Sequence, residues 1–390
     1  MNILLAKFNP MVGVLGGAEK IFCEMANELA LRGHNVSILF SDNNLGKPYF
    51  SLKDNIAIYN LNHLQTGGKQ YDLQVQEFPV ALKLKRELIR LYDKDYAREM
   101  KEIYLGNKIA DNIIRAVDYI KPDVIISHGL LTTRWMIVDA RINIPVVTMF
   151  HDEPSDLLST ATNNVIYALS KSTLIHVLLP YGVDIVKKYC PNSSVVVIGN
   201  PVAQLSKIIG QEHKDKFKIV TVGRLTKRQK RQDLLIRAFS LIADKFPNWN
   251  VEIWGPCTDL KYKDELENII HKHKLEKRVL LCGSTDNVSR VLDTADIFVL
   301  PSQYEGFGLG LVEAMSKGLP VIGMKDCLAI SNMIHHGKTG LLSEKSPANL
   351  GELLSKLMSD YRLRCALGDA AHEYAKQYSS KVIWENGIQL

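Results

Sequence analysis

Short apolar runs rich in branched side chains alternate with stretches of helical periodicity along most of the chain. The first run covers residues 3–8, and apolar residues then recur at helical spacing from Ala18 to Leu29. The same alternation restarts near residue 217, after a polar stretch. Strands that alternate with helices form parallel sheets with helices on both faces. The pattern therefore predicts an α/β protein with two doubly wound domains.

The breaks in this alternation predict the domain boundaries. We expect an N-terminal domain at 1–200, a linker at 201–216, a C-terminal domain at 217–365 and a helical tail at 366–390. An insertion at about 41–110 interrupts the first domain, with a charged helical stretch from about Val80 to Tyr104. Further strands are expected at 36–40, 124–127, 146–150, 174–179, 195–198, 217–222, 251–254, 279–282, 297–300 and 321–322.

Composition narrows the class of protein. A chain of 390 residues suits two domains, and 46% hydrophobic with 23% charged residues excludes a disordered or fibrous protein. We expect no membrane-spanning helix and no secretory signal, because no long apolar segment occurs. The six cysteines are widely spaced without a CxxC pair, which predicts reduced, mostly buried thiols in a cytoplasmic protein. The net charge of +6 permits an anionic ligand or an anionic membrane surface.

Glycines separate the first expected strand from the helix that follows it. Gly16 and Gly17 precede Ala18 and Glu19. Free N–H groups at a helix N-terminus bind anions, and glycine lets a ligand approach the backbone. The segment lacks the GxGxxG dinucleotide pattern, and a tight strand–helix turn explains it equally well.

A dense basic cluster follows the strand expected at 217–222. Five cations occur within residues 224–231, among them Arg224 and Lys230. Arginine offers a planar fork to phosphate oxygens and lysine a point charge. A solvated basic loop is the alternative interpretation. Nucleic acid is not expected, because no aromatic residues are interleaved with these cations.

Two glutamates flank a glycine-rich turn after the strand expected at 297–300. Glu305 should lie at the strand end, and Glu313 one turn into the next helix. Amides near Phe307, Gly308 and Leu309 would face a diphosphate at the start of that helix. Carboxylates accept hydrogen bonds from sugar hydroxyls, so the segment suits a nucleotide sugar.

One histidine and one pair of acidic residues elsewhere are candidates for a catalytic or metal site. His151 ends the strand expected at 146–150, which favours a place in the site over a structural role. Asp93-Lys94-Asp95 spells a metal-binding pair, but it falls within a charged helical stretch and is better explained as solvated charge. We expect no metal site, so cations and helix amides must offset the charge of a leaving diphosphate.

Taken together, these motifs resemble the retaining glycosyltransferases of the GT-B fold, in the large family that contains many bacterial polysaccharide and lipopolysaccharide transferases. The resemblance spans nearly the whole chain and is strongest at 217–345. It departs from the family at Asn200-Pro201 and at 327–332. The matching segments are Gly16 to Glu19, His151, Val222 to Leu225, Lys230, Gln232 to Leu235, the Glu305 and Glu313 pair, Ser316 to Ile322, and Gly337 to Leu342.

The resemblance implies roles for individual residues. Arg224 and Lys230 would bind the donor diphosphate, and Glu313 would hold the ribose. Glu305 would contact the donor sugar at the reacting face, with His151 near that sugar. The segment Gly283-Ser284-Thr285 would bind the base. The full set of candidate residues comprises Gly16, Gly17, His151, Arg224, Lys230, Gly283, Ser284, Thr285, Glu305, Phe307, Gly308, Leu309 and Glu313.

The resemblance also implies a fold and a reaction. Two Rossmann-like domains would face a central cleft, and the tail would cross back to the first domain. The reaction would transfer a sugar from a nucleoside diphosphate sugar, most simply UDP- or GDP-linked, to a glycan or lipid-linked glycan acceptor, with retention and without a cofactor. A nucleotide-sugar epimerase, a soluble disaccharide synthase and a non-catalytic nucleotide-sugar-binding subunit are the alternatives.

A basic amphipathic helix is expected at 82–101. It carries seven cations against four acids, with leucines at helical spacing. Such a helix can bind an anionic membrane surface, or it can simply cover the first domain's core. Because a lipid-linked acceptor would be presented at the inner leaflet, we expect peripheral attachment there.

Overall fold

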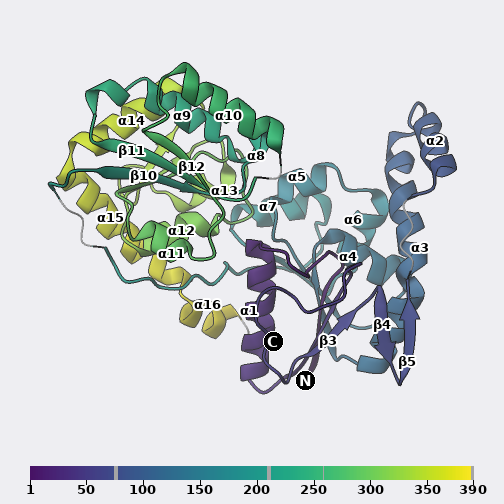
Figure 1. Cartoon of the computed structure of the whole chain (residues 1–390). Helices are drawn as coiled ribbons and strands as arrows, with labels where there is room; N and C mark the ends of the chain where they lie inside the picture. Colours follow the sequence, from purple (N-terminus) through teal and green to yellow (C-terminus); the bar gives the residue numbers. More distant parts are fainter. Residues whose placement is uncertain (74–77, 209–211, 258, 388–390) are drawn as a thin grey trace. The chain divides into compact units, whose positions relative to one another are not determined.

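The computed structural model describes the whole chain except residues 74–77, 209–211, 258 and 388–390 (Figure 1). The chain forms two compact units, Met1–Ile198 and Gly199–Leu390. Parts of the predicted insertion, linker and tail, at 74–77, 209–211 and 388–390, lie outside the described residues.

The first unit is built on a seven-stranded sheet in which every neighbouring pair of strands is parallel. Across the sheet the strands are β3 (Ala57–Asn60), β2 (Asn35–Phe40), β1 (Asn2–Lys7), β6 (Val124–His128), β7 (Val146–Met149), β8 (Leu174–Val177) and β9 (Val195–Val197). From β1 the chain runs outward through β2 to β3, and then resumes at β6 on the other side of β1. The order reverses between β1 and β6, and in open parallel sheets the carboxyl ends at such a reversal carry ligand sites.

Helices cover this sheet through two apolar clusters. In one, Leu4 and Ile125 of the sheet pack with Ile113 and Met136 of the helices. In the other, Ile175 and Val177 of β8 are part of a cluster that includes Val165. The helices are α1 (Gly17–Leu31), α2 (Val80–Ile89), α3 (Lys94–Ile120), α4 (Leu130–Arg134), the π-helix η1 (Trp135–Asp139), α5 (Pro154–Ser159), α6 (Asn163–Ser170) and α7 (Tyr181–Tyr189).

The structure differs from expectation at two places in the insertion at 41–110. No strand was expected at Ala57–Asn60, which forms β3 and extends the main sheet beside β2. The charged stretch from Val80 to Tyr104 is not one helix but two, α2 and α3. Asp93 begins α3, because its side chain accepts a hydrogen bond from the N–H of Tyr96. A small antiparallel hairpin, β4 (His63–Thr66) and β5 (Lys69–Asp72), completes this region.

The second unit contains a six-stranded sheet whose strands are again all parallel. Its order is β12 (Val279–Gly283), β11 (Trp249–Trp254), β10 (Phe217–Val222), β13 (Ile297–Leu300), β14 (Val321–Met324) and β15 (Leu341–Ser343). Here the strand order reverses between β10 and β13. The predicted α/β class with two doubly wound parallel sheets is therefore confirmed.

Two helical layers enclose the second sheet. α9 packs with α10 and α14, whereas α12 packs with α11 and α15, so the two groups form separate layers on opposite faces of the sheet (Figure 1). The helices are α8 (Lys227–Lys230), α9 (Gln232–Ser240), η2 (Ala243–Lys245), α10 (Leu260–Lys272), α11 (Val288–Leu292), α12 (Leu309–Ser316), α13 (Leu328–Met333), α14 (Pro347–Ser359), α15 (Tyr361–Ala375), η3 (Lys376–Tyr378) and α16 (Ser380–Gly387).

The expectations about membrane-spanning helices and cysteines can be compared with the described residues. None of their helices combines the length and hydrophobicity needed to cross a lipid bilayer. Cys23, Cys190 and Cys327 are buried, and Cys257, Cys282 and Cys365 are partly exposed.

Candidate functional site

The reversal of strand order in the second unit brings the basic cluster and the glutamate segment together. Arg224 follows the end of β10, and Glu305 lies on the loop that follows β13, the strand beside it. The two loops are joined directly, because the N–H of Gln303 donates to the carbonyl of Gln229 at 2.7 Å. Residues about 80 positions apart in sequence thus share one edge of the sheet.

Lys230 and Glu305 form an ion pair at this edge. Both side chains are largely buried, at 14% and 10% exposure. The stem of Lys230 crosses Gly223, where an added Cβ would lie 3.3 Å from the lysine Cδ and Cε. Glycine at the end of β10 therefore leaves the space through which the ammonium reaches Glu305.

Arg224 contrasts with this buried pair. Its side chain is exposed, and within the described part of the chain it has no ion-pair partner. Its carbonyl is fixed by Gln232, whose amide donates to it at 2.9 Å. The backbone is thus held while the guanidinium remains available to an anion from solution.

Sequence reasoning missed a residue that links three loops of this edge. Arg231 is buried and has a left-handed backbone with φ of 46°. Its guanidinium donates to the carbonyl of Pro301 at 3.1 Å and to both carboxylate oxygens of Asp326 at 2.8 and 2.9 Å. Asp326 follows β14, so one side chain connects the loops after β10, β13 and β14. The dense charge at 224–231 drew attention to Arg231, but no local signal indicated its partner.

The glycine-rich turn before α12 has the geometry that a helix start requires. Gly308 caps α12 with φ of 87°, and an added Cβ would lie 2.8 Å from Ile330 Cδ1. The Phe307 side chain is buried edge-on against Tyr378 at 5.2 Å between ring centroids, so only its backbone is open to a ligand role. Leu309 begins the helix, and Glu313 is half-buried one turn further on.

The segment predicted to bind the base lies farther along the same edge. Gly283 ends β12 with φ of 75°, and exposed Ser284 follows it. Thr285 accepts a hydrogen bond from the N–H of Asn287 at 3.0 Å. Because β12 is separated from β10 by β11, this segment does not join the Lys230 and Glu305 pair.

In the first unit, an ion pair occupies the reversal between β1 and β6. Lys7 ends β1 and pairs at 2.9 Å with Glu19 in the first turn of α1. Glu19 folds back over Gly16, so an added Cβ at Gly16 would lie 2.0 Å from the Glu19 carboxylate. Gly16 caps α1 and Gly17 begins it, as expected for a strand–helix turn.

Three histidines follow Lys7 along the same sheet edge. His128 ends β6, His151 follows β7, and His176 lies in β8. The rings of His128 and His151 are stacked, with centroids 3.8 Å apart and planes 7° from parallel, and His176 is tilted 6.2 Å from His151. Only His151 had been predicted. His128 has a strand-end signal of its own, whereas His176 is hidden inside an apolar run.

These imidazoles are held in the uncharged form. Burial, the nearby His151 and the Lys7 ammonium hold the pKa of His128 well below its ordinary value. Burial, His176 and Lys7 do the same to the pKa of His151. Burial also lowers the pKa of His176 to about 4, against the opposing effect of its bond to the carbonyl of Ile198.

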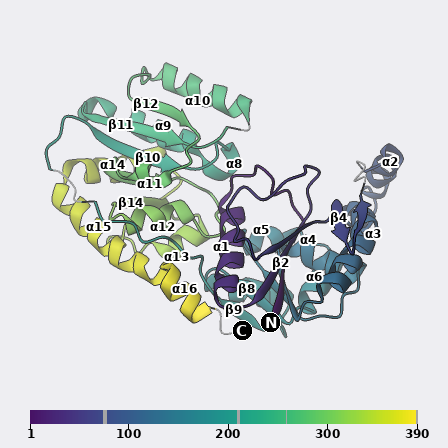
Figure 2. The same cartoon turned by 60° about the horizontal axis from the view of Figure 1, so that its bottom comes forward.

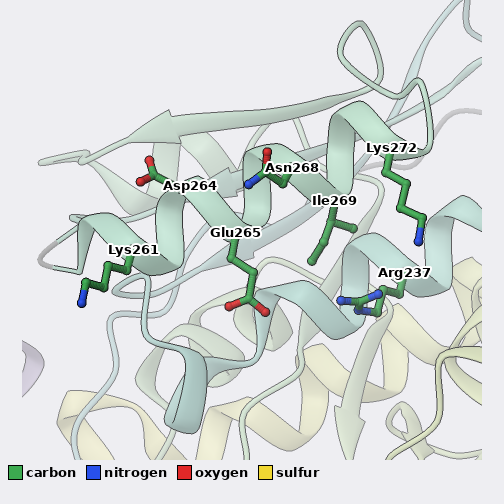
Figure 3. Close-up of a pocket in the computed structure, with 7 residues that line it drawn as sticks. All are labelled: Arg237, Lys261, Asp264, Glu265, Asn268, Ile269 and Lys272. Carbon is green, nitrogen blue, oxygen red and sulfur yellow. The ribbon is translucent and has the colours of Figure 1, made fainter.

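Other polar groups do not form comparable sites. A pocket of about 440 Å³ lies between α9 and α10, lined by residues of both charges that include Arg237, Glu265 and Lys272 (Figure 3). None of the predicted site residues lines it. In the described residues, no group of three or more His, Cys, Asp or Glu side chains is arranged to hold a metal ion.

The predicted residues are thus divided between the two units. Arg224, Lys230 and Glu305 share one edge in the second unit, with Gly308 and Glu313 on the helix that follows the same strand. Gly16, Gly17 and His151 belong to the first unit. Their roles stay predictions.

Comparisons with known proteins give the family. Residues 15–203 match "Glycosyltransferase Family 4", and residues 204–374 match "Glycosyl transferases group 1". An uncharacterized glycosyltransferase of Haemophilus influenzae is 25% identical over 96% of this chain and 96% of its own length. The N-acetyl-alpha-D-glucosaminyl L-malate synthase of Bacillus anthracis is 26% identical over 95% of this chain and 92% of its own.

A solved structure shows the same fold. A variant of TarM from S. aureus, in complex with fondaparinux, alpha-GlcNAc-glycerol and UDP, has a TM-score of 0.73 at 16% identity and covers 99% of this chain and 98% of its own. Because the two matched regions together run from residue 15 to residue 374, the chain belongs to the family 4-like glycosyltransferases, and its fold is GT-B.

Proposed function

We propose that this glycosyltransferase transfers a sugar from a nucleoside diphosphate sugar to a glycan or lipid-linked glycan of the cell surface, with retention at the anomeric carbon. The observation that carries the proposal is the edge of the second sheet. There an exposed Arg224 lies at the same strand reversal as the buried Lys230 and Glu305 pair.

In this proposal the cations bind the donor diphosphate. Arg224 presents its guanidinium fork to the phosphate oxygens, and Lys230 meets the charge that develops on the leaving group. The backbone amides at the start of α12 add the partial positive charge of a helix N-terminus. These groups together offset the diphosphate charge without a metal ion or another cofactor.

The carboxylates bind the sugars of the donor. Glu313 accepts hydrogen bonds from the ribose hydroxyls, and Glu305 contacts the transferred sugar, because it lies beside the cation that meets the leaving group. The segment Gly283-Ser284-Thr285 contacts the base through its backbone. UDP is our first choice of nucleotide, since the TarM complex contains UDP.

The acceptor assignment draws on α2. Val80, Leu84, Leu88 and Leu91 recur at helical spacing and are 65–76% exposed. α2 lies at the outer end of α3, away from the sheet of its unit (Figure 2). Cations such as Lys85 and Arg90 are close to these leucines in the sequence. An exposed apolar stripe with basic neighbours is suited to the headgroup region of an anionic membrane, where a lipid-linked acceptor would be found.

The donor is tested by incubation with UDP-, GDP- and ADP-sugars, following nucleotide release with and without acceptors. We expect release to depend on a glycan or lipid-linked acceptor and to persist in EDTA. Glu313→Ala should mainly weaken nucleotide binding measured by calorimetry, and Glu305→Ala should mainly lower turnover. Donor binding without turnover on any acceptor would favour a non-catalytic subunit, and isomerised donor would favour an epimerase.

The membrane surface is tested by vesicle co-sedimentation. Binding should occur on anionic but not neutral vesicles and weaken from about 50 to about 300 mM salt. The double variant Leu84→Ser, Leu88→Ser should bind less, whereas Leu241→Ser, which changes an exposed leucine of the second unit, should bind as the wild type does. Equal sedimentation with both vesicle types would reject this surface.

A soluble acceptor is the second candidate. The relative that matches over 95% of this chain is named for a synthase that joins a sugar to L-malate, a small soluble acid. Efficient transfer to small acceptors, unaffected by the Leu84 and Leu88 changes, would favour that function over a lipid-linked glycan.

A further inference from the structure

The edge of the first sheet contains buried polar atoms without partners. His128 and His176 are 7% and 4% exposed. Nε2 of His128, both ring nitrogens of His151 and Nδ1 of His176 are buried and have no hydrogen-bond partner among the described residues. A buried polar atom without a partner is costly, so a cluster of four such nitrogens requires an explanation.

We propose that His128 and His176 are positioning residues that hold the ring of His151 in one orientation, with its nitrogens available to hydroxyl groups of a sugar substrate. This inference rests on the proposed function. It adds two residues that neither the sequence motifs nor the resemblance assigns.

The strands fix the two positioning residues relative to each other. In the sheet, Met149 of β7 is the register partner of both His128 and His176. His151 follows Met149 by two residues, and its ring stacks on the ring of His128. Phe22 of α1 also contacts His128, with ring centroids 5.7 Å apart and the ring planes 81° from parallel. His128 is therefore a fixed platform for the His151 ring.

His176 is fixed through its other nitrogen. Its Nε2 lies 2.6 Å from the carbonyl oxygen of Ile198, which can only accept a hydrogen bond. Nε2 therefore carries the proton and Nδ1 carries a lone pair. Nδ1 of His176 is thus an acceptor, and the ring cannot change its tautomer without losing the hydrogen bond to Ile198.

The ligand that fits these nitrogens is uncharged. A neutral imidazole has one donor and one acceptor nitrogen, which matches hydroxyl groups that both donate and accept. A phosphate would accept only, and would favour protonated rings instead. The charged neighbours do not supply that state: the Lys7 ammonium opposes protonation of His128 and His151, and Glu19 is already paired with Lys7.

The positioning role is tested first without substrate, by NMR of the full chain labelled with ¹³C at histidine Cε1, titrated from about pH 8 to about pH 4. His151→Asn assigns the His151 signal. We expect the pKa of His151 to lie well below its ordinary value in the wild type and in His128→Phe, which keeps a stacking ring. In His128→Ala, water should reach the ring and the pKa of His151 should rise by about one unit or more.

Activity is measured on the same variants with the best donor of the nucleotide-sugar panel. His128→Ala should lower kcat/KM about tenfold and move its acid limb to higher pH, whereas His128→Phe should restore most of the activity. His176→Gln keeps a donor for Ile198 but lacks Nδ1, and should lower kcat severalfold without changing the affinity for UDP. The exposed His273→Asn is the control and should change nothing.

Several outcomes would overturn the inference. An ordinary His151 pKa in the wild type, or an unchanged His151 pKa and activity in His128→Ala, would do so. If His128→Ala does not fold, loss of activity in His128→Phe as large as in His151→Asn would also reject the stacking role. If the wild type transfers no sugar from any donor, the proposed function fails, while the NMR titration still decides whether His128 positions His151.

Discussion

The two parallel sheets place side chains of different character at the same topological position. In the first unit, the edge has three imidazoles that burial keeps uncharged, beside the single ion pair of Lys7 with Glu19. In the second unit, the corresponding edge has Lys230 paired with Glu305 and Arg231 paired with Asp326. The topology decides where ligand groups gather, and the residues that end the strands decide which chemistry gathers there.

The difference follows from how each edge offsets the free-energy cost of burying ionisable side chains. A buried charge needs a partner, and at the edge of the second unit the largely buried Lys230 and Arg231 each have a carboxylate. An imidazole can avoid the cost by releasing its proton, and the first unit uses this alternative. Cations suit a diphosphate, whereas neutral imidazoles suit hydroxyl groups.

The largest expected effect is a loss of turnover when the ammonium of Lys230 is removed from the second edge. Lys230→Met keeps the stem that crosses Gly223 but removes the ammonium. Turnover should fall about 10²-fold or more, because the cation acts on charge that develops at the leaving group. Steady-state kinetics with a saturating donor measure the effect. Lys227→Met is the matched control, since Lys227 is exposed and pairs with Glu265 instead. Equal turnover in both variants would contradict the contrast between the two edges.

A second, smaller effect concerns the pH dependence of the free energy of unfolding, which His176 should influence in the first unit. The folded-state pKa of His176, about 4, lies below the usual value of about 6.5 in an unfolded chain. Its contribution to stability is therefore complete above pH 6.5 and is lost as the pH falls toward 4, because the unfolded chain then binds the additional proton. His176→Gln should reduce the loss of stability between pH 7 and pH 4.5 by about 2 kcal/mol.

Asp139, an acidic residue of the same unit, should change stability with pH in the opposite direction. Burial raises the pKa of Asp139 to about 6, so its folded form takes up a proton first as the pH falls. Asp139→Asn should therefore make the loss of stability toward acid steeper. Hydrogen exchange at β6–β8 measures both variants, with β10 and β13 as the internal reference. A change of equal size in both sheets would contradict the assignment to the first unit.

Local sequence predicted the edges better than it predicted their contacts. The expected strands 217–222 and 297–300 coincide with β10 and β13, because largely buried parallel strands leave a run of mostly apolar residues. β3 was missed because its four residues are only half-buried at the sheet margin. The break between α2 and α3 was missed although Asp93 is a typical N-cap residue.

Contacts between distant segments left no local signal at all. Arg231 and Asp326 are 95 positions apart, and each looks like an ordinary loop charge in its own segment. The stacking of His128 on His151 likewise depends on the order of β6 and β7 in the sheet. Such pairs follow from topology, which the alternation of strands and helices constrains but does not determine.

The smallest expected effect concerns how the charged edge is held in place. Asp326→Asn weakens the fork that connects Arg231 to the loop after β14. Since the Asp326 side chain is 39% exposed, solvent screens the pair, and the stability of the second unit should fall by only about 1 kcal/mol. Arg231→Gly removes the same fork but relieves the left-handed backbone, a gain of about 1 kcal/mol, so its stability should stay near that of the wild type.

Both variants should nevertheless lower kcat about threefold to fivefold, because Lys230 precedes Arg231 and loses its fixed backbone. Chemical denaturation and steady-state kinetics separate the two quantities. Full activity in Arg231→Gly would mean that the ion pair of Lys230 and Glu305 orients itself without the fork.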